Sequence, residues 1–361
     1  MKVLYAIQAT GNGHISRAKE IIPFLQKFAQ TDIFLSGSNS QVQLPFEVKF
    51  RSNGLSLFYS KNGGLDYAKT FSSIKTRQIW DEVRHLPVEQ YDLVINDFEC
   101  ISAYAAKLKG VKSVAFGHQA AFLSAATPRP PQRSLFGEWL LRYYAPCQYA
   151  LGLHFQTFDH FIFPPIIRQE VRQLNPQNRK HYTIYLPHYQ DETLLEHIGK
   201  LQDVEFHLFS KQVRYPKRIR NVQFLPIQNE TYLQSLETCE GLITGGGFEA
   251  PAEAMFLGKK VLVIPIKGQY EQLCNAYALE QIGVRRISHI GKSFAKKLDY
   301  WIDEPVGFQL KYPHHTEQLV GQVLQQRNLQ QCKGFSTSQQ TLLTKFLGFP
   351  FPKFTSPSGN Y

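Results

Sequence analysis

The sequence predicts an α/β protein made of two doubly wound domains, each with a mostly parallel sheet. Three observations support this. The length of 361 residues suits two domains. Short apolar, β-branched runs alternate with amphipathic stretches. The alternation stops once, in the proline-rich and polar segment 163–180, and then restarts. We therefore expect domains at 1–165 and 181–330, a linker at 166–180 and an extension at 331–361.

In the first half, apolar runs predict strands and amphipathic stretches predict helices. The expected strands are Lys2–Ala6, Asp32–Ser36, Phe46–Phe50, Asp92–Ile95, Lys112–Phe116 and Tyr149–Phe155, and the expected helices are His14–Ala29, Thr70–His85 and Ser102–Leu108. Because strands that alternate with helices favour a parallel sheet, the carboxyl ends of these strands should share one edge, where such sheets bind ligands.

The second half repeats the alternation and predicts another doubly wound unit. Strands are expected at 182–187, 204–209, 222–226, 241–244 and 260–265, and helices at 191–201, 231–239, 248–257 and 272–282. No fixed-period repeat or low-complexity block interrupts this pattern.

The composition indicates a soluble, cytoplasmic chain. It contains no run of 18 or more apolar residues, no signal-peptide pattern, and five scattered cysteines without metal or redox spacing. The net charge of +11 favours an anionic partner, but no nucleic-acid motif accompanies it. The aromatic segment Pro128–Pro146 could contact an anionic membrane, shape an acceptor pocket, or form an ordinary core helix.

The first candidate site is the loop "TGNGH", between the first strand and the first helix. Gly11 and Gly13 let backbone N–H groups approach an anion or polar ligand. The loop is neither a P-loop nor a dinucleotide fingerprint, because Ser16 stands at the third glycine position. A tight turn without a ligand is the alternative interpretation.

His14 would lie in the first turn of that helix, at the carboxyl edge of the sheet. The helix N-terminus favours a neutral ring, which can accept a proton from a hydroxyl. Asp97 and Glu99 end another strand at the same expected edge, so Asp97 could hold the imidazole in one tautomer. The alternatives are a histidine that only lines the loop and an acidic residue that caps a helix.

The second candidate site is "ITGGGFEAPAEA", from Ile243 to Ala254. Gly245, Gly246 and Gly247 end a strand and precede a helix, so their N–H groups could hold a diphosphate. Glu253 could accept hydrogen bonds from ribose hydroxyls, and Glu271 and Gln272 could bond to the hydroxyls of a sugar. Asn275 could tie the following helix to the glycine loop.

These motifs, with "GKKVLVIP" and "EQLCNA", resemble the GT-B nucleotide-sugar glycosyltransferases. The resemblance covers most of the chain. The most similar branch includes the peptidoglycan N-acetylglucosaminyltransferase and the antibiotic, flavonoid and glucuronosyl transferases. It implies two facing Rossmann-like domains, a C-terminal segment that crosses back to the first domain, and inverting transfer of a hexose. The implied donor is a nucleoside diphosphate sugar, most commonly of uridine.

The resemblance also implies roles for individual residues. His14 would be the base and Asp97 would orient it. Glu253 would bind the ribose, and Glu271 and Gln272 the donor hexose. The remaining donor-side residues are Gly13, Gly245, Gly246, Gly247, Phe248, Glu249 and Asn275. The acceptor hydroxyl would lie near Gly11, Asn12, Glu99 and His118, although His118 could equally be a structural histidine. Since no Asp-x-Asp motif is present, no metal or cofactor is expected.

Two departures from the family pattern leave the function open. Gly245 stands where plant and macrolide enzymes have a histidine, and Glu249 is unexpected beside a diphosphate. Lys267 or the basic run 211–220 could assist the backbone amides. The alternatives are a nucleotide-sugar 2-epimerase of the same fold and a non-catalytic nucleotide-sugar-binding protein.

Overall fold

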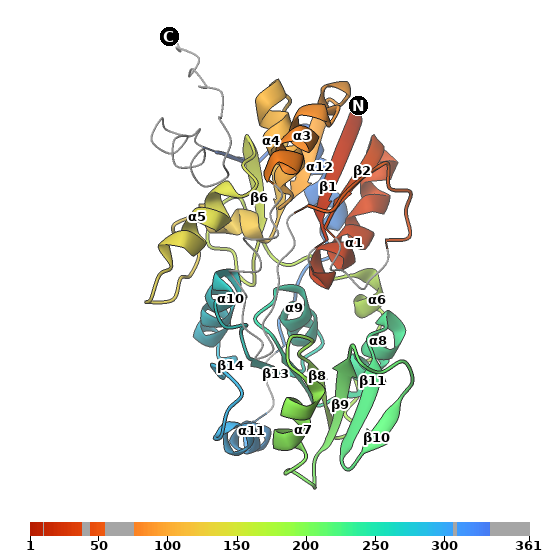
Figure 1. Ribbon diagram of the computed structural model, residues 1–361, viewed down its shortest axis with the longest axis vertical. Coiled ribbons are helices and arrows are strands. Elements are labelled where there is room, and N and C mark those ends of the chain that lie inside the picture. The colour runs from red at the N-terminus through yellow and green to blue at the C-terminus, as the bar shows by residue number, and fades with distance from the viewer. Residues whose placement is uncertain (10, 38–43, 55–75, 306–308, 333–361) are drawn as a thin grey trace.

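The computed structural model describes residues 1–9, 11–37, 44–54, 76–305 and 309–332. Within them the chain forms two separate sheets, one above the other in Figure 1. This agrees with the expected pair of mostly parallel α/β units. The expected helix Thr70–His85 is described only from Thr76 onward, and most of the extension 331–361 lies outside the described residues.

The first sheet has the order β15-β6-β5-β4-β1-β2-β3, with β7 also paired to β6. Only the β15 pairing is antiparallel among its described pairs. The strands are β1 (Lys2–Gln8), β2 (Gln30–Ser36), β3 (Phe50–Ser52), β4 (Leu93–Asp97), β5 (Ser113–Gly117), β6 (Tyr149–Leu153), β7 (Ile162–Phe163) and β15 (Gln330–Gln331). The expected strand Phe46–Phe50 is displaced, since β3 begins at Phe50.

Helices cover both faces of this sheet. They are α1 (Asn12–Phe28), α3 (Thr76–His85), η1 (Val88–Gln90), α4 (Cys100–Lys109), η2 (Gln119–Leu123) and α5 (Leu135–Tyr143). On one face α1 shares a core with Tyr5 and Ile95, and on the other α4 packs with Val94. Because side chains alternate along a strand, Asp97 lies on the α1 face and Asn96 on the α4 face.

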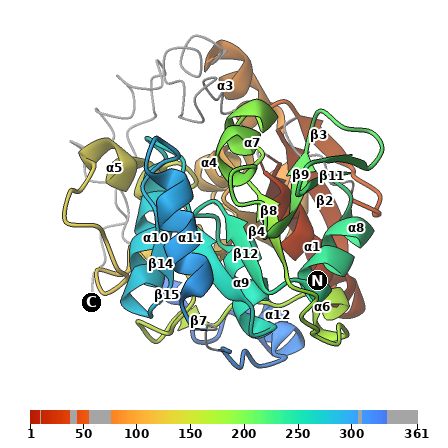
Figure 2. The ribbon, with the colours of Figure 1, turned by 90° about the horizontal axis from the view of Figure 1, so that it is seen from below.

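The second sheet has the order β10-β11-β9-β8-β12-β13-β14. Its strands are β8 (His181–Tyr185), β9 (Glu205–Ser210), β10 (Lys217–Ile219), β11 (Val222–Pro226), β12 (Gly241–Thr244), β13 (Lys260–Val263) and β14 (Arg285–Arg286), and its helices are α7 (Asp191–Ile198), α8 (Asn229–Thr238), α9 (Glu249–Phe256), α10 (Tyr270–Gln281) and α11 (Phe294–Asp303). Seen from below, β8 lies near the middle, with α10 and α11 on one side and α8 on the other (Figure 2).

The chain passes between the domains twice. The first passage contains the short helix α6 (Gln169–Arg172), whose Val171 is buried. The second leads to α12 (Thr316–Gln325), which packs against α1, and then to β15, which pairs with β6. The chain thus returns to the first domain inside 181–330, the range expected for the second domain, so α12 packs on the first domain instead.

The described residues contain no helix that is both long enough and apolar enough to cross a membrane. Nor do they bring together three or more His, Cys, Asp or Glu side chains in a way that could hold a metal ion. All five cysteines are free thiols.

Candidate active site

Two glycine loops meet between the sheets. Gly11 lies in the loop after β1 and Gly13 in the first turn of α1, while the loop after β12 leads into α9 at Glu249. A methyl group at Gly13 would lie 3.2 Å from Glu249 Cγ, so the loops are in close contact. Asn12 also donates a hydrogen bond of 2.8 Å to the hydroxyl of Tyr185, at the end of β8. The carboxyl edges of both sheets therefore face each other here.

His14 and Asp97 form a hydrogen-bonded pair at this meeting point. Their Nδ1 and Oδ1 atoms are 2.9 Å apart, and the Asp97 carboxyl is fully buried. Because a carboxylate accepts hydrogen bonds, Nδ1–H donates to it and Nε2 keeps the lone pair that can take a proton. Burial alone would raise the pKa of Asp97, but the charges of Arg17 and His14 outweigh it and lower that pKa. The expected contact between the two residues is thus present.

Arg17 joins this pair to the second domain, and the sequence analysis missed it. Its side chain is 2% exposed, NH2 donates to Asp97 Oδ1 at 2.6 Å, and NH1 donates to Glu249. Burial opposes its charge, but Asp97 and Glu249 outweigh that effect and raise the pKa of Arg17. The spacing from His14 could have indicated Arg17, because residues three apart on a helix lie on the same face.

Glu249 begins α9 and reaches across to the first domain. Its side chain is 13% exposed. Burial raises its pKa to about 7, against the opposing attraction of Arg17. The carboxyl group therefore changes charge close to neutral pH, directly beside the histidine–aspartate pair.

The second glycine loop is held by side chains of α10. Gln272 Oε1 accepts hydrogen bonds from the N–H groups of Gly246 and Ile266, at 3.1 and 3.0 Å. Asn275 Nδ2 donates to the carbonyl of Gly246 at 3.0 Å, which confirms the expected tie between helix and loop. A methyl group at Gly246 would lie 2.4 Å from the carbonyl oxygen of Gln272, whereas one at Gly247 would meet nothing within 4 Å. The loop is packed on one side and open at Gly247.

His118 lies inside the contact between the domains. Its side chain is buried, and its ring stacks on Phe248 with centroids 4.0 Å apart and planes 7° apart. Its Nε2 is 2.7 Å from Asn275 Oδ1, and burial lowers its pKa. In the structure His118 therefore connects the two domains instead of lining an open surface.

Glu253 is paired with an arginine of the linker. Arg168 donates to both carboxylate oxygens, at 2.6 and 3.0 Å, and both side chains are more than nine-tenths buried. Arg168 also donates to Asn229 Oδ1 at 2.8 Å. The expected ribose-binding carboxylate thus has a protein partner that the sequence analysis did not identify.

Two other acidic residues named from the sequence are also placed. Glu99 is buried at the N-cap of α4, where its carboxylate accepts from the N–H groups of Ile101 and Ser102. Glu271 is 17% exposed, with its Oε1 4.0 Å from His118 Nε2. Glu99 therefore stabilises a helix end, while Glu271 lies at the domain contact.

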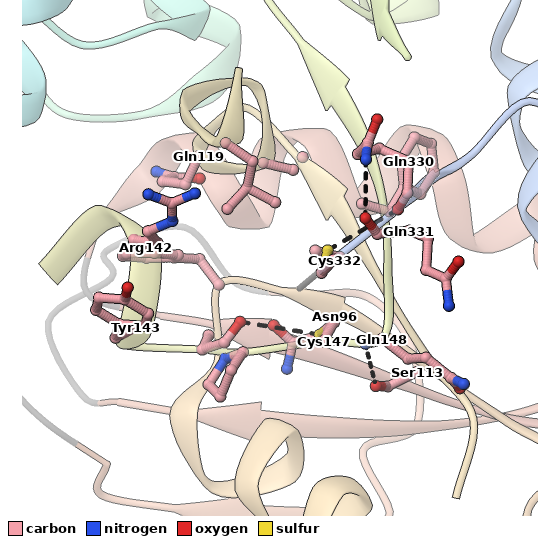
Figure 3. Close-up of a pocket in the computed structure, with 18 of the residues that line it drawn as sticks. Asn96, Ser113, Gln119, Arg142, Tyr143, Cys147, Gln148, Gln330, Gln331 and Cys332 are labelled. Carbon is pink, nitrogen blue, oxygen red and sulfur yellow. Dashed lines mark hydrogen bonds between the residues drawn. The ribbon is translucent and has the colours of Figure 1, made fainter. Parts of the chain in front are cut away.

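A cavity of about 710 Å³ lies on the α4 face of the first sheet, over β5 (Figure 3). Asn96, Ser113, Arg142 and Cys332 are among its lining residues. Because Asn96 and Asp97 point to opposite faces of β4, the sheet separates this cavity from the His14–Asp97 pair. The cavity is large enough for a small ligand, but it is not where His14 would act.

The aromatic segment Pro128–Pro146 forms α5, which contacts α10. Tyr270 donates a hydrogen bond of 2.6 Å to Glu138, and Tyr270 packs so closely on Gly137 that a methyl group there would be 2.4 Å from the ring. Leu135, at the start of the helix, is 88% exposed. One side of the segment therefore belongs to the domain contact.

The comparisons agree with this architecture. The sequence pattern of the family Glycosyl transferase family 1 matches residues 1–299, and no curated protein sequence matches the chain. Among solved structures, UGT89C1 of Arabidopsis thaliana with UDP has a TM-score of 0.55 at 13% identity, covering 96% of this chain and 99% of that one. MurG of Acinetobacter baumannii has a TM-score of 0.53 at 13% identity, covering 90% and 99%.

The glycotransferase of kitacinnamycin has a TM-score of 0.53 at 15% identity, covering 91% of this chain and 95% of that one. These likenesses concern the fold, while the family match spans well over half of the sequence. The chain therefore belongs to Glycosyl transferase family 1, and it is a glycosyltransferase with the GT-B fold of two facing, mostly parallel α/β domains.

Proposed function

We propose that the protein transfers a hexose from a nucleoside diphosphate sugar to an acceptor hydroxyl, with inversion at the anomeric carbon. The observation that carries the proposal is the His14–Asp97 pair, hydrogen-bonded at 2.9 Å and facing the glycine loop of the other domain. A base on one domain and an anion-binding loop on the other suit a single displacement between two bound substrates.

The donor would lie on the second domain. The diphosphate would bind the N–H groups at the start of α9, where the helix dipole favours negative charge and Gly247 leaves space. His188 follows β8 beside this loop, since a methyl group at Gly245 would be 3.6 Å from its Cε1. Its Nε2 is buried without a hydrogen-bond partner among the described residues, so it can bond to a phosphate oxygen.

The rest of the donor would contact residues already held in place. Glu271 and Gln272 would bind hexose hydroxyls. Glu253 would accept from the ribose, because a carboxylate has about four acceptor positions and Arg168 occupies two. Uridine is the proposed base, supported by the solved relative UGT89C1, which was crystallised with UDP.

In the proposed reaction, the acceptor oxygen bonds to the anomeric carbon as the bond from that carbon to the diphosphate oxygen breaks. His14 Nε2 takes the acceptor's hydroxyl proton, and Asp97 stabilises the resulting imidazolium. The negative charge that grows on the diphosphate is stabilised by N–H groups already oriented toward it.

The acceptor would lie against the first domain near Gly11, where a methyl group would meet nothing within 4 Å. Asn12, Glu99 and His118 are already bonded to protein groups, so they would shape the acceptor site from behind more than contact its hydroxyl. The proposed acceptor is a lipid-linked or surface glycan. The protein would be cytoplasmic and contact an anionic membrane through the exposed start of α5 at Leu135.

A thermal-shift panel of nucleoside diphosphates and their sugars tests the donor site, because a ligand that binds the folded state raises the melting temperature. Uridine compounds should give the largest shift, and no shift with any nucleotide would contradict the proposal. Product analysis then tests the reaction. Epimerised donor without an acceptor would favour a 2-epimerase. Binding without turnover on any acceptor pool would favour a non-catalytic protein.

A further inference from the structure

Arg17 is a buried cation with two carboxylate partners and no other role in the proposed reaction. It lies on α1, one helical turn from His14, and donates to Asp97 and to Glu249 of the facing domain. Its Nε is buried and lacks a hydrogen-bond partner among the described residues. A buried guanidinium with a free N–H group is suited to bind a further anion.

The Glu249 carboxylate occupies the place where an anion is expected. It extends from the first residue of α9 into the space between the glycine loops, against Gly13. Oxyanions favour such helix ends, and the first residue of this one carries a carboxylate that accepts from Arg17. A phosphate oxygen bound at this helix end would therefore compete with the Glu249 carboxylate for Arg17.

We propose that Arg17 is the cation that neutralises the diphosphate of the donor, and that the diphosphate displaces Glu249 from it. This inference rests on the proposed function, since it requires a nucleoside diphosphate at α9. It assigns to the first domain a direct contact with the leaving group. Arg17 would then connect the catalytic base to the donor, because one of its nitrogens bonds to Asp97 and another to the diphosphate.

Charge balance determines what happens to Glu249. Arg17 supplies one positive charge between two carboxylates, and a diphosphate adds further negative charge beside them. The other groups that face Glu249 are His14 on α1, Asp97 on β4, Tyr5 on β1 and Glu253 on its own helix. Only His14 and Arg17 among these can be cationic. The nearby diphosphate therefore drives Glu249 to take up a proton from solvent, which frees Arg17.

Proton uptake gives a direct test. Since burial raises the pKa of Glu249 to about 7, this carboxyl is mostly ionised in the free protein at pH 7.5, and binding of UDP should take up about 0.8 proton. Calorimetry of UDP binding in buffers of different ionisation enthalpy measures this number. The same equilibrium predicts that UDP affinity falls about eightfold between pH 7.5 and 8.5.

Three variants make the test specific. Glu249→Gln should bind UDP at least as tightly as the wild type, without proton uptake and with affinity nearly independent of pH. Arg17→Met should weaken UDP binding at least tenfold. Glu317→Gln, which removes a carboxylate from the exposed pair with Lys27, should behave like the wild type.

Equal proton uptake by the wild type and Glu249→Gln would overturn the inference, as would wild-type UDP affinity in Arg17→Met. Should Arg17→Met fail to fold, the Glu249→Gln comparison still decides, because that substitution keeps the size of the side chain. If neither UDP nor dTDP binds the wild type at all, the proposed function itself fails, and that result is distinct from binding without proton uptake.

Discussion

Substitutions in the buried pair of Arg168 and Glu253 should separate its structural role from ribose binding. Glu253→Leu leaves the guanidinium in a site where the Arg168 side chain is only 8% exposed, with the half-exposed Glu170 carboxylate as its one remaining acidic partner among the described residues. Loss of one partner of a buried pair typically costs about 3 to 5 kcal/mol. Coulomb attraction at ~4 Å with an effective dielectric constant near 20 also gives about 4 kcal/mol. We therefore expect Glu253→Leu to lower the free energy of unfolding by about 4 kcal/mol.

Urea unfolding of the wild type, Glu253→Leu, Arg168→Met and the double variant measures the free energy of unfolding of each. Arg168→Met should lose a similar amount, because it leaves the Glu253 carboxylate buried and unpaired. The double variant removes both charges and should recover most of the loss, since apolar replacements of a whole buried pair are often tolerated. A loss below about 1 kcal/mol in the single variants, or a double variant that loses the sum of both, would refute the reasoning.

The double variant then tests the nucleotide. It should remain folded but bind UDP about ten to a hundred times more weakly, because a hydrogen bond to a charged group is worth about 1.5 to 3 kcal/mol. Calorimetry measures that affinity. Wild-type affinity in the double variant would show that Glu253 only anchors the linker, and the proposed ribose contact would be wrong.

Three further predictions concern the site and the domain contact. His14→Ala should lower kcat by about a hundred- to ten-thousandfold while UDP affinity changes little, and Asp97→Asn should also lower kcat. Product formation measures kcat and calorimetry measures UDP affinity. Loss of UDP binding with retained kcat would contradict the assignment of His14 as the base. Between about pH 4.5 and 7 the folded state binds more protons at Glu249 than the unfolded chain does, so the contribution of Glu249 to stability should fall as the pH rises through that window. Urea unfolding at several pH values should show this decline. The variant Glu249→Gln should lack it. His118→Ala should lower the free energy of unfolding by about 1 to 3 kcal/mol, because it leaves the buried Asn275 amide oxygen without its partner and removes the stack on Phe248. An unchanged urea unfolding midpoint would show that this contact between the domains does not stabilise the fold.

Much of the fold follows from local sequence patterns. The strands β1 and β12 are predictable because strands buried on both faces of a parallel sheet are almost continuously apolar in sequence. The contact of His14 with Asp97 was also predictable, since parallel strands bring their carboxyl ends to one edge. The short strands β10 and β14 are rich in Lys and Arg, and their pairing depends on a neighbouring strand that no local pattern reveals.

The missed residues of the site depend on contacts that are distant in the sequence. Arg168 lies 85 residues from Glu253 in a segment whose prolines indicate a linker, and nothing local shows that its charge is buried. His118 and Asn275 are 157 residues apart and belong to different domains. Glu249 seemed out of place beside a diphosphate when considered alone, and its partner Arg17 becomes visible only when the two domains face each other.

The return of α12 and β15 to the first domain has a consequence for synthesis. The outer edge of β6 pairs with β15 at Tyr149 and Ala150, and Leu319 and Val323 join the core beside α1. The ribosome makes α12 and β15 after the second domain, so the first domain cannot complete its fold until the second has been synthesised. Until then it exposes a strand edge and an apolar helix face, both prone to pair with other chains. A fragment that ends at the linker should therefore aggregate, and the chain is best expressed intact.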